Sequence, residues 1–269
     1  MKAVIPIAGL GTRFLPVTKS VPKEMLPIVD KPVIQYLIEE AAQAGIDEVI
    51  MVINDNNEIT RKYFTPDPVF EKTIKDKGRS NLTESLQELL NKIKFTYVRQ
   101  EQPLGDGHAI LQAKEAVGNE PFLVLFGDDI IDNEISAAKQ LIETFQQKNC
   151  SIIALEKIPP EKTKSYGVIA PKSSEGRLHE IESLVEKPEP ENAPSNLGII
   201  GKYVCTPEIW QHLETAESSH RGEIRLIDGF RSLINEQPIY GLEIQGQRFD
   251  TGTPNGLLGA STHFASKQD

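Results

Sequence analysis

The sequence has few cysteines and no long hydrophobic run. Its two cysteines, Cys150 and Cys205, are far apart and lack the close pairing of zinc sites, which favours buried, inert thiols in a reducing compartment. No apolar run approaches the ~18 residues of a membrane span. The amino-terminal KAVIPIAGLG is too short for a signal peptide and is followed by no small-residue cleavage site. We therefore expect a cytoplasmic protein with no membrane partner.

An excess of positive charge is also missing. The 269 residues carry a formal net charge of -10 at pH 7, so the surface as a whole repels nucleic acid and anionic lipid. The five histidines show no metal-ligand spacing, and no serine or cysteine lies in a recognisable nucleophile setting. The sequence thus offers no candidate for covalent catalysis, and any basic site must be a local concentration of charge.

What the sequence does contain is the pattern of an α/β protein. Its 39% hydrophobic and 25% charged residues are typical of a folded globular chain. Short apolar runs, often β-branched, predict strands at 2–8, 48–53, 94–99, 121–126 and 151–155. Helical patterns lie at 32–44, 106–117 and 134–148. This alternation favours βαβ units and a mostly parallel sheet, with the ligand beyond the carboxyl ends of the strands.

The composition of the sequence changes after residue 156, where proline-rich connections appear. Further strands are expected at 166–170, 177–186, 197–204 and 239–248, with helical stretches at 206–214 and 223–235. No linker is long or polar enough to free an independent domain, so this part is expected to extend the same sheet. The charged segment 71–92 reads as a helical surface excursion without assigned chemistry.

The stretch GLGTRFLPVTKSVPKEMLPIVDKP (9–32) concentrates positive charge behind the first predicted strand. A glycine-rich turn at this place brings backbone N–H groups close to a phosphate. Phe14 occupies the position that a GxGxxG dinucleotide fingerprint would need as glycine, and the GK[ST] of a P-loop is absent. Four prolines hold Lys19 and Lys23 on a preset path near Arg13. Such a loop suits a polyphosphate, although any single lysine is more simply a solvated surface residue.

Carboxylates at the ends of two predicted strands supply negative charge that complements this basic loop. Asp128 and Asp129 follow the apolar FLVLFG, and Asp250 follows a second strand in QRFDTGTP. A carboxylate there is costly unless a cation meets it, and one or two carboxylates with substrate phosphates are the usual ligands of Mg²⁺. The alternative is that Asp128 caps a following helix and Asp250 makes an Asx turn with Thr251 and Gly252.

Glu186 and Lys187, in LVEKPEP, end a predicted strand before a proline that is expected to keep them extended. Most such pairs are surface residues. An acid that accepts from hydroxyls beside a cation that holds one phosphate would, however, suit a sugar phosphate.

Together these motifs make the chain similar to the bacterial UTP–glucose-1-phosphate uridylyltransferases, or UDP-glucose pyrophosphorylases. GLGTRFLPVTKSVPKEMLPIVDKPVIQY resembles their signature, and the likeness continues in order through QPLGDGHAI, FGDD, YGV, VEKP, SNLGIIGKY, GEIRLIDG and RFDTGTPNG. The GxGTR turn alone indicates only the wider sugar nucleotidyltransferase superfamily, whereas PKEMLP with FGDD points to the uridylyl branch.

The resemblance implies a Rossmann-like three-layer α/β sandwich with a mostly parallel mixed central sheet, the nucleotide-diphospho-sugar transferase fold. It further implies a single domain over 1–269, with a nucleotide-binding half of about 1–130 and a sugar-phosphate-binding half of about 131–269. The family also leads us to expect a homodimer or homotetramer. Its small-molecule substrates would be UTP and glucose 1-phosphate, and its cofactor Mg²⁺.

Site residues follow from the resemblance, motif by motif. Arg13 and Lys23 would embrace the triphosphate as the catalytic cations, and Asp128 and Asp250 would bind the metal. Nucleotide binding is implied for Ala8, Gly9, Gly11, Gln102, Gly107 and Asp129. The sugar phosphate would meet Gly167, Glu186 and Lys187.

Three motifs depart from the family pattern. The usual LGLGHA, GEIQLTDA and PAAG read LGDGHA, GEIRLIDG and PIAG here, so Asp106 adds a negative charge near the expected base site and Arg225 adds a positive one. The same chemistry with dTTP or another hexose 1-phosphate stays open. A catalytically silent nucleotide-sugar-binding homologue would be expected to have lost some of the implied catalytic residues, but all are intact. A dinucleotide-dependent dehydrogenase does not fit Phe14.

Overall fold

A nine-stranded mixed sheet forms the centre of the protein in the computed structural model, which describes residues 1–216 and 222–267. The strand order is β5-β4-β1-β6-β11-β8-β12-β10-β9. The first four strands are parallel, whereas β10 and β11 run against the others. The strands are β1 (Lys2–Pro6), β2 (Pro27–Ile28), β3 (Lys31–Pro32), β4 (Glu48–Ile53), β5 (Lys94–Arg99), β6 (Phe122–Leu125), β7 (Asp129–Asp132), β8 (Ile152–Lys157), β9 (Gly167–Glu175), β10 (Leu178–Glu186), β11 (Leu197–Cys205), β12 (Tyr240–Glu243) and β13 (Gln247–Asp250).

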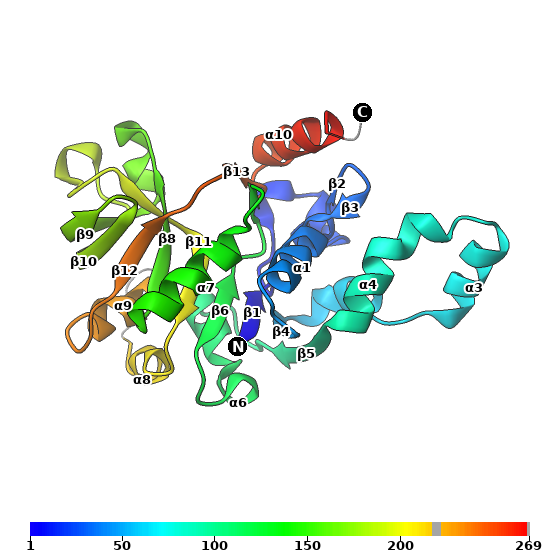
Figure 1. The fold of residues 1–269 in the computed structure, drawn as a ribbon, viewed down its shortest axis with the longest axis horizontal. Coiled ribbons are helices and arrows are strands. Elements are labelled where there is room, and N and C mark those ends of the chain that lie inside the picture. The colour runs from blue at the N-terminus through cyan, green and yellow to red at the C-terminus, as the bar shows by residue number, and fades with distance from the viewer. Residues whose placement is uncertain (217–221, 268–269) are drawn as a thin grey trace.

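Helices cover both faces of this sheet (Figure 1). They are α1 (Val33–Gln43), α2 (Glu58–Tyr63), α3 (Pro68–Asp76), α4 (Glu84–Lys92), α5 (Asp106–Leu111), α6 (Lys114–Val117), α7 (Ala137–Lys148), α8 (Ile209–Glu214), α9 (Leu226–Leu233) and α10 (Pro254–Ala265). One hydrophobic cluster joins the sheet to α1 and α7, and another joins it to α5, α8 and α9. The expected three-layer α/β sandwich is therefore confirmed.

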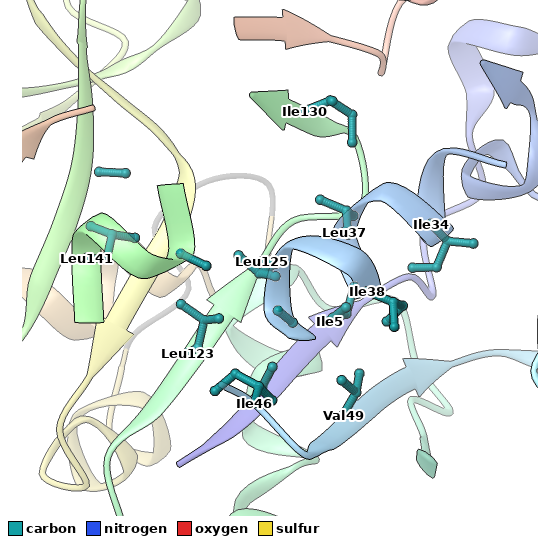
Figure 2. Packing of buried hydrophobic residues seen from close by; sticks show 14 of the residues in the cluster. Ile5, Ile34, Leu37, Ile38, Ile46, Val49, Leu123, Leu125, Ile130 and Leu141 are labelled. Atoms are coloured by element: carbon teal, nitrogen blue, oxygen red, sulfur yellow. The ribbon is translucent and has the colours of Figure 1, made fainter. Parts of the chain in front are cut away.

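Alternating side chains of the central strands feed the two cores. Ala3 and Ile5 belong to the cluster under α1, while Val4 belongs to the opposite cluster, as the two-residue period of a strand requires. Figure 2 shows Leu37 and Ile38 of α1 beside the side chains of the neighbouring strands. Because both faces are covered, these strands are continuous apolar runs, which is why sequence patterns located them well.

The secondary-structure predictions are wrong where one stretch of sequence was assigned to a single strand or helix. The stretch 239–248 divides into β12, in the main sheet, and β13, in a two-stranded ribbon with β7. Gly246 lies between them with φ 130°, a conformation that favours glycine. The helix expected over 106–117 divides into α5 and α6. Asp128 caps no helix, since β7 follows it.

Two parts lie away from the sheet. The excursion predicted over 71–92 covers α4 and most of α3, which project from one end of the molecule (Figure 1). Helix α10, which the sequence patterns missed, packs on β13 and β2. Among the described residues, no helix is long and apolar enough to span a bilayer.

Candidate active site

A polar pocket of about 600 Å³ opens beyond the carboxyl end of β6. It collects residues from the N-terminal loop, the β6–β7 connection, the β9–β10 hairpin and the end of β13. Of the residues predicted for the site, those lining it are Arg13, Asp128, Asp129, Gly167, Glu186, Lys187 and Asp250. The fold thus brings the expected metal ligands and sugar-phosphate residues together.

Asp128 and Asp250 converge on one small volume. A Cβ placed on Gly252 would lie 2.5 Å from Asp128 Oδ2 and 3.0 Å from Asp250 Oδ1. The backbone holds this arrangement, because Thr251 N donates to the Asp128 carbonyl at 2.8 Å. Gly252 N also donates to Asp250 Oδ1 at 3.1 Å, so the expected Asx turn exists alongside the carboxylate pair.

This pair has the donor set of a site for a hard divalent cation. Two carboxylates leave most coordination positions to phosphate oxygens and water, as Mg²⁺ prefers. The described residues contain no group of three or more His, Cys, Asp or Glu side chains that could hold a metal alone. A metal in this pocket would therefore depend on substrate for part of its shell.

Lys23 forms an ion pair with Asp128 Oδ2. Burial by itself would raise the pKa of Asp128, but the Lys23 ammonium, with Arg13 and Arg248 further away, holds that pKa below its usual value. Asp128 is therefore an anion over the whole neutral range, ready to accept a cation. Arg13 reaches the same region, with its Nη1 3.5 Å from the Gly252 carbonyl oxygen.

The N-terminal loop is folded into short 3-10 turns at Thr12–Phe14, Val17–Lys19 and Lys23–Met25. Gly11 adopts φ 61°, and a Cβ there would lie 3.0 Å from Thr18 Cγ2 and 3.2 Å from Lys23 Cβ. Thr18 Oγ1 donates to the Gly11 carbonyl at 2.9 Å. The glycine is thus needed for a tight loop that places Lys23 next to Asp128.

Asp129 lies behind these groups and is only 4% exposed. One carboxylate oxygen accepts from Arg248 Nε, and the other accepts from Gly201 N at 2.6 Å. Arg248 also donates to Glu156 and to the Tyr166 hydroxyl, each at 3.0 Å. Both oxygens of Asp129 are therefore engaged with the protein, in a network that joins β7 and β13 to β8 and β11.

The sugar-phosphate candidates meet at the β9–β10 pairing, where Glu186 lies opposite Gly167. A Cβ on Gly167 would lie 3.3 Å from Glu186 Oε2, so the glycine leaves this carboxylate room. Lys187 Nζ is 3.3 Å from Glu186 Oε1. The expectation of an extended Lys187 is wrong, because its φ is 48°; a left-handed lysine is uncommon and typical of functional positions.

The candidates for base and ribose lie outside this pocket. Ala8 is buried and its carbonyl accepts from Asn54 Nδ2 at 2.5 Å. Gly9 and Gln102 are exposed. Gly107 is buried, and its N–H donates to the Ile224 carbonyl at 3.0 Å. None of these four residues therefore lines the pocket that holds the metal and sugar-phosphate candidates.

Sequence reasoning missed Arg248, which lines the pocket, and Glu24, which is buried in the N-terminal loop. Arg248 stands two positions before Asp250 on a strand, so the two-residue period alone could have placed both side chains on one face. Glu24 is fully buried, and its Oε1 accepts from Asn57 Nδ2 and, at 3.3 Å, from Thr60 Oγ1. No sequence signal distinguishes this inward glutamate from a solvated one.

Burial raises the pKa of Glu24 to about 7. Its Oε2 is buried without a hydrogen-bond partner among the described residues. Asn57 Nδ2 also donates to the Ile7 carbonyl at 3.2 Å. Through Asn57, Glu24 thus ties the cationic loop to the chain just after β1.

Comparisons with known proteins agree with this geometry. A sequence model of the nucleotidyl transferase family matches residues 2–267. The UTP–glucose-1-phosphate uridylyltransferase of Bacillus subtilis (strain 168) is 44% identical over 264 residues, covering 98% of this chain and 90% of that protein.

Solved structures give the same result. A crystal structure of UDP-glucose pyrophosphorylase complexed with UDP-glucose superposes with a TM-score of 0.92 at 40% identity, covering 99% of this chain and 98% of that one. An apo UDP-glucose pyrophosphorylase gives 0.96 at 40% identity, covering 100% and 99%. The chain therefore belongs to the nucleotidyl transferase family, within its branch of UTP–glucose-1-phosphate uridylyltransferases.

Proposed function

We propose that the protein transfers a uridylyl group from UTP to glucose 1-phosphate, with Mg²⁺, giving UDP-glucose and pyrophosphate. A phosphate oxygen of glucose 1-phosphate forms the new bond to the α-phosphorus, and the bond from that phosphorus to the α–β bridging oxygen breaks. The electron pair leaves with pyrophosphate. The observation that carries the proposal is the convergence of Asp128 and Asp250 on one volume, in a pocket that also holds Arg13, Glu186 and Lys187.

Asp128 and Asp250 would hold the Mg²⁺. Bound there, the cation would draw charge from the phosphate oxygens of both substrates and favour in-line displacement. Lys23, whose ammonium pairs with Asp128 through Oδ2 alone, would donate its other hydrogens to the triphosphate. Arg13, at the Gly252 carbonyl, joins it in stabilising the charge that develops on pyrophosphate.

The sugar phosphate binds at the β9–β10 pairing. Lys187 neutralises its phosphate. The Glu186 carboxylate accepts hydrogen bonds from the glucose hydroxyls, and the backbone of Gly167 meets the same hydroxyls. No residue needs to remove a proton, because the attacking phosphate oxygen is already an anion. The protein's contribution is to hold two polyanions together that would repel each other in water.

The nucleotide binds in the half formed by about residues 1–130. Ala8, Gly9, Gly11 and Gln102 hold the base, ribose and phosphates. Gly107 and Asp129 complete the nucleotide-binding set, and the Gly107 N–H and both Asp129 oxygens also have protein partners that hold them in place. The sugar phosphate occupies the half from about 131 to 269. A homodimer or homotetramer in the cytoplasm stays a prediction.

Pyrophosphate release tests the assignment. Purified protein with Mg²⁺ is assayed with UTP, dTTP, ATP, CTP and GTP, each against glucose, galactose, mannose and N-acetylglucosamine 1-phosphates. We expect UTP with glucose 1-phosphate to have the highest kcat/KM. A preference for dTTP or another sugar would correct the substrates but keep the chemistry. Binding of UDP-glucose without turnover of any pair would instead establish a silent homologue.

A further inference from the structure

Arg225 occupies the sugar end of the pocket, beside the carboxylate proposed to meet the glucose hydroxyls. Its guanidinium donates through Nη1 to Glu186 Oε1, and its Nη2 lies 3.8 Å from Glu223 Oε2. The Arg225 and Glu186 side chains are only 13% and 23% exposed, so their pair is largely shielded from water, whereas Glu223 is 46% exposed. Because Lys187 Nζ also lies 3.3 Å from Glu186 Oε1, two cations and two carboxylates are already paired here. This end of the pocket therefore suits a neutral sugar rather than one that carries a carboxylate.

The backbone around Arg225 is fixed from the nucleotide side. Leu226 N donates to Asp106 Oδ1 at 2.7 Å. Ile224 N donates to the Leu104 carbonyl at 2.8 Å, and the Ile224 carbonyl accepts from Gly107 N at 3.0 Å. The segments 104–107 and 224–226 are thus joined by three hydrogen bonds.

The contact between these segments is also sterically tight. A Cβ on Gly107 would lie 2.6 Å from the Arg225 carbonyl carbon, so only glycine permits the approach. Asp106 is held inside this junction, and its burial raises the pKa of its carboxyl to about 6. Arg225 is therefore carried on a rigid support rather than on a free loop.

We propose that Arg225 is a positioning residue that fixes the Glu186 carboxylate toward the sugar hydroxyls and thereby sets the preference among neutral hexose 1-phosphates. The inference rests on the proposed function. Arg225 holds Oε1, which leaves Oε2 near Gly167, at 3.3 Å from the position of a Cβ there. A carboxylate oxygen that is fixed in one place can accept from an equatorial hydroxyl of one hexose but not from the axial hydroxyl of its epimer. A mobile carboxylate oxygen can accept from either hydroxyl.

The test compares Arg225→Gln with the wild type and with a matched control. We expect Arg225→Gln to raise KM for glucose 1-phosphate by about tenfold, in line with the loss of a charge-assisted hydrogen bond. Its preference for glucose over galactose 1-phosphate should fall by about as much, while KM for UTP stays within about twofold. Arg225→Lys, which keeps the charge but not the fork geometry, should lie between the two.

The control is Arg231→Gln, on helix α9, which begins directly after Arg225. Arg231 lies outside the pocket, where it pairs with Asp228 and donates to the Leu184 carbonyl at 3.0 Å. It should change neither KM nor the sugar preference. An unchanged sugar preference in Arg225→Gln, or an equal change in Arg231→Gln, would overturn the inference.

A binding measurement separates failure of this inference from failure of the proposed function. Calorimetry gives the ratio of the Kd values for UDP and UDP-glucose, which isolates the sugar contribution without turnover. The ratio should fall by about tenfold in Arg225→Gln and stay the same in Arg231→Gln. Absence of turnover in the wild type would reject the proposed function alone, and an unchanged ratio in Arg225→Gln would reject the positioning role alone. A wild type that shows no turnover and binds UDP-glucose no more tightly than UDP would reject both.

Discussion

The pocket has an inner and an outer region, and they hold their charges differently. In the inner region, the carboxylate of Asp129 is bonded through both oxygens, and Arg248 has three protein partners. In the outer region, Asp250 accepts from the backbone of Gly252, but no ion pair of Asp250 occurs among the described residues. Lys187 is 48% exposed beside Glu186.

This difference separates groups that build the site from groups that meet substrate. A buried charge that is already paired with protein groups is less available to a ligand, and removing it leaves its partner unpaired in the interior. A charge with open capacity costs little stability and is free to bind. Asp128 with Lys23 stands between the two classes, since the two side chains are paired with each other but stay 25% and 21% exposed.

The largest effect is expected from breaking the inner pair. Arg248→Met leaves Asp129 buried and unpaired, which should lower the free energy of unfolding by about 3–5 kcal/mol. Urea denaturation measures the change. The double variant Arg248→Met with Asp129→Asn should recover part of it, because no buried charge remains. A loss below about 1 kcal/mol, the range of exposed pairs, would show that the inner pair is as loosely held as the outer groups.

The outer carboxylate should behave in the opposite way. Asp250→Asn keeps an oxygen for the Gly252 N–H but removes the charge, so we expect kcat to fall by about 10² to 10³-fold, as for other preorganised charge stabilisers. The melting temperature should change little. Activity within about tenfold of the wild type, together with a large drop in melting temperature, would make Asp250 a structural residue.

Glu24 sharpens the comparison, because it is buried with neutral hydrogen-bond donors. Its pKa is raised from 4.5 to about 7, so the cost of ionising it is absent below pH 4.5, grows as pH rises through this window and is complete above pH 7. Glu24→Gln has no such cost. Relative to the wild type, this variant should gain up to about 3 kcal/mol of stability between pH 4.5 and 8.

Denaturation of both proteins across this pH range measures the gain. The contribution of Asp106, whose pKa is also raised, is common to both and cancels in the difference. A stability difference that is the same at pH 5 and pH 8 would mean that Glu24 ionises normally in the folded protein.

The smallest effect is expected at an exposed pair. Lys114 and Glu214 are 42% and 47% exposed, and solvent screens such pairs strongly. Lys114→Met should change the free energy of unfolding by less than about 1 kcal/mol, and it should leave kcat unchanged. If urea denaturation shows a larger loss in the free energy of unfolding, side-chain exposure does not separate the two classes of charge.

The sequence predicted the fold best where burial dictates the residue pattern. The ranges 48–53 and 94–99 match β4 and β5, because parallel strands in an α/β sheet carry apolar or β-branched runs. It predicted worst where a tertiary contact decides. Strand β13 leaves the main sheet to pair with β7, and α10 packs on β13, and neither contact is encoded in a local pattern.

The same distinction between local patterns and tertiary contacts applies to the site residues. Motifs identified the residues that meet at the pocket, among them Arg13, Asp128 and Asp250. They could not show that Lys23 is paired with Asp128, nor that Arg225 reaches Glu186. These pairings join residues about 40 to more than 100 positions apart, and only the folded chain brings them into contact.

Direct transfer between the two substrates is the central claim, and isotope exchange between UTP and pyrophosphate tests it most directly. Labelled pyrophosphate is incubated with enzyme, Mg²⁺ and UTP, with or without glucose 1-phosphate. If the phosphate of glucose 1-phosphate attacks UTP directly, label enters UTP only when the sugar phosphate is present. Exchange at a rate near turnover in its absence would require a covalent uridylyl-enzyme and would contradict the account.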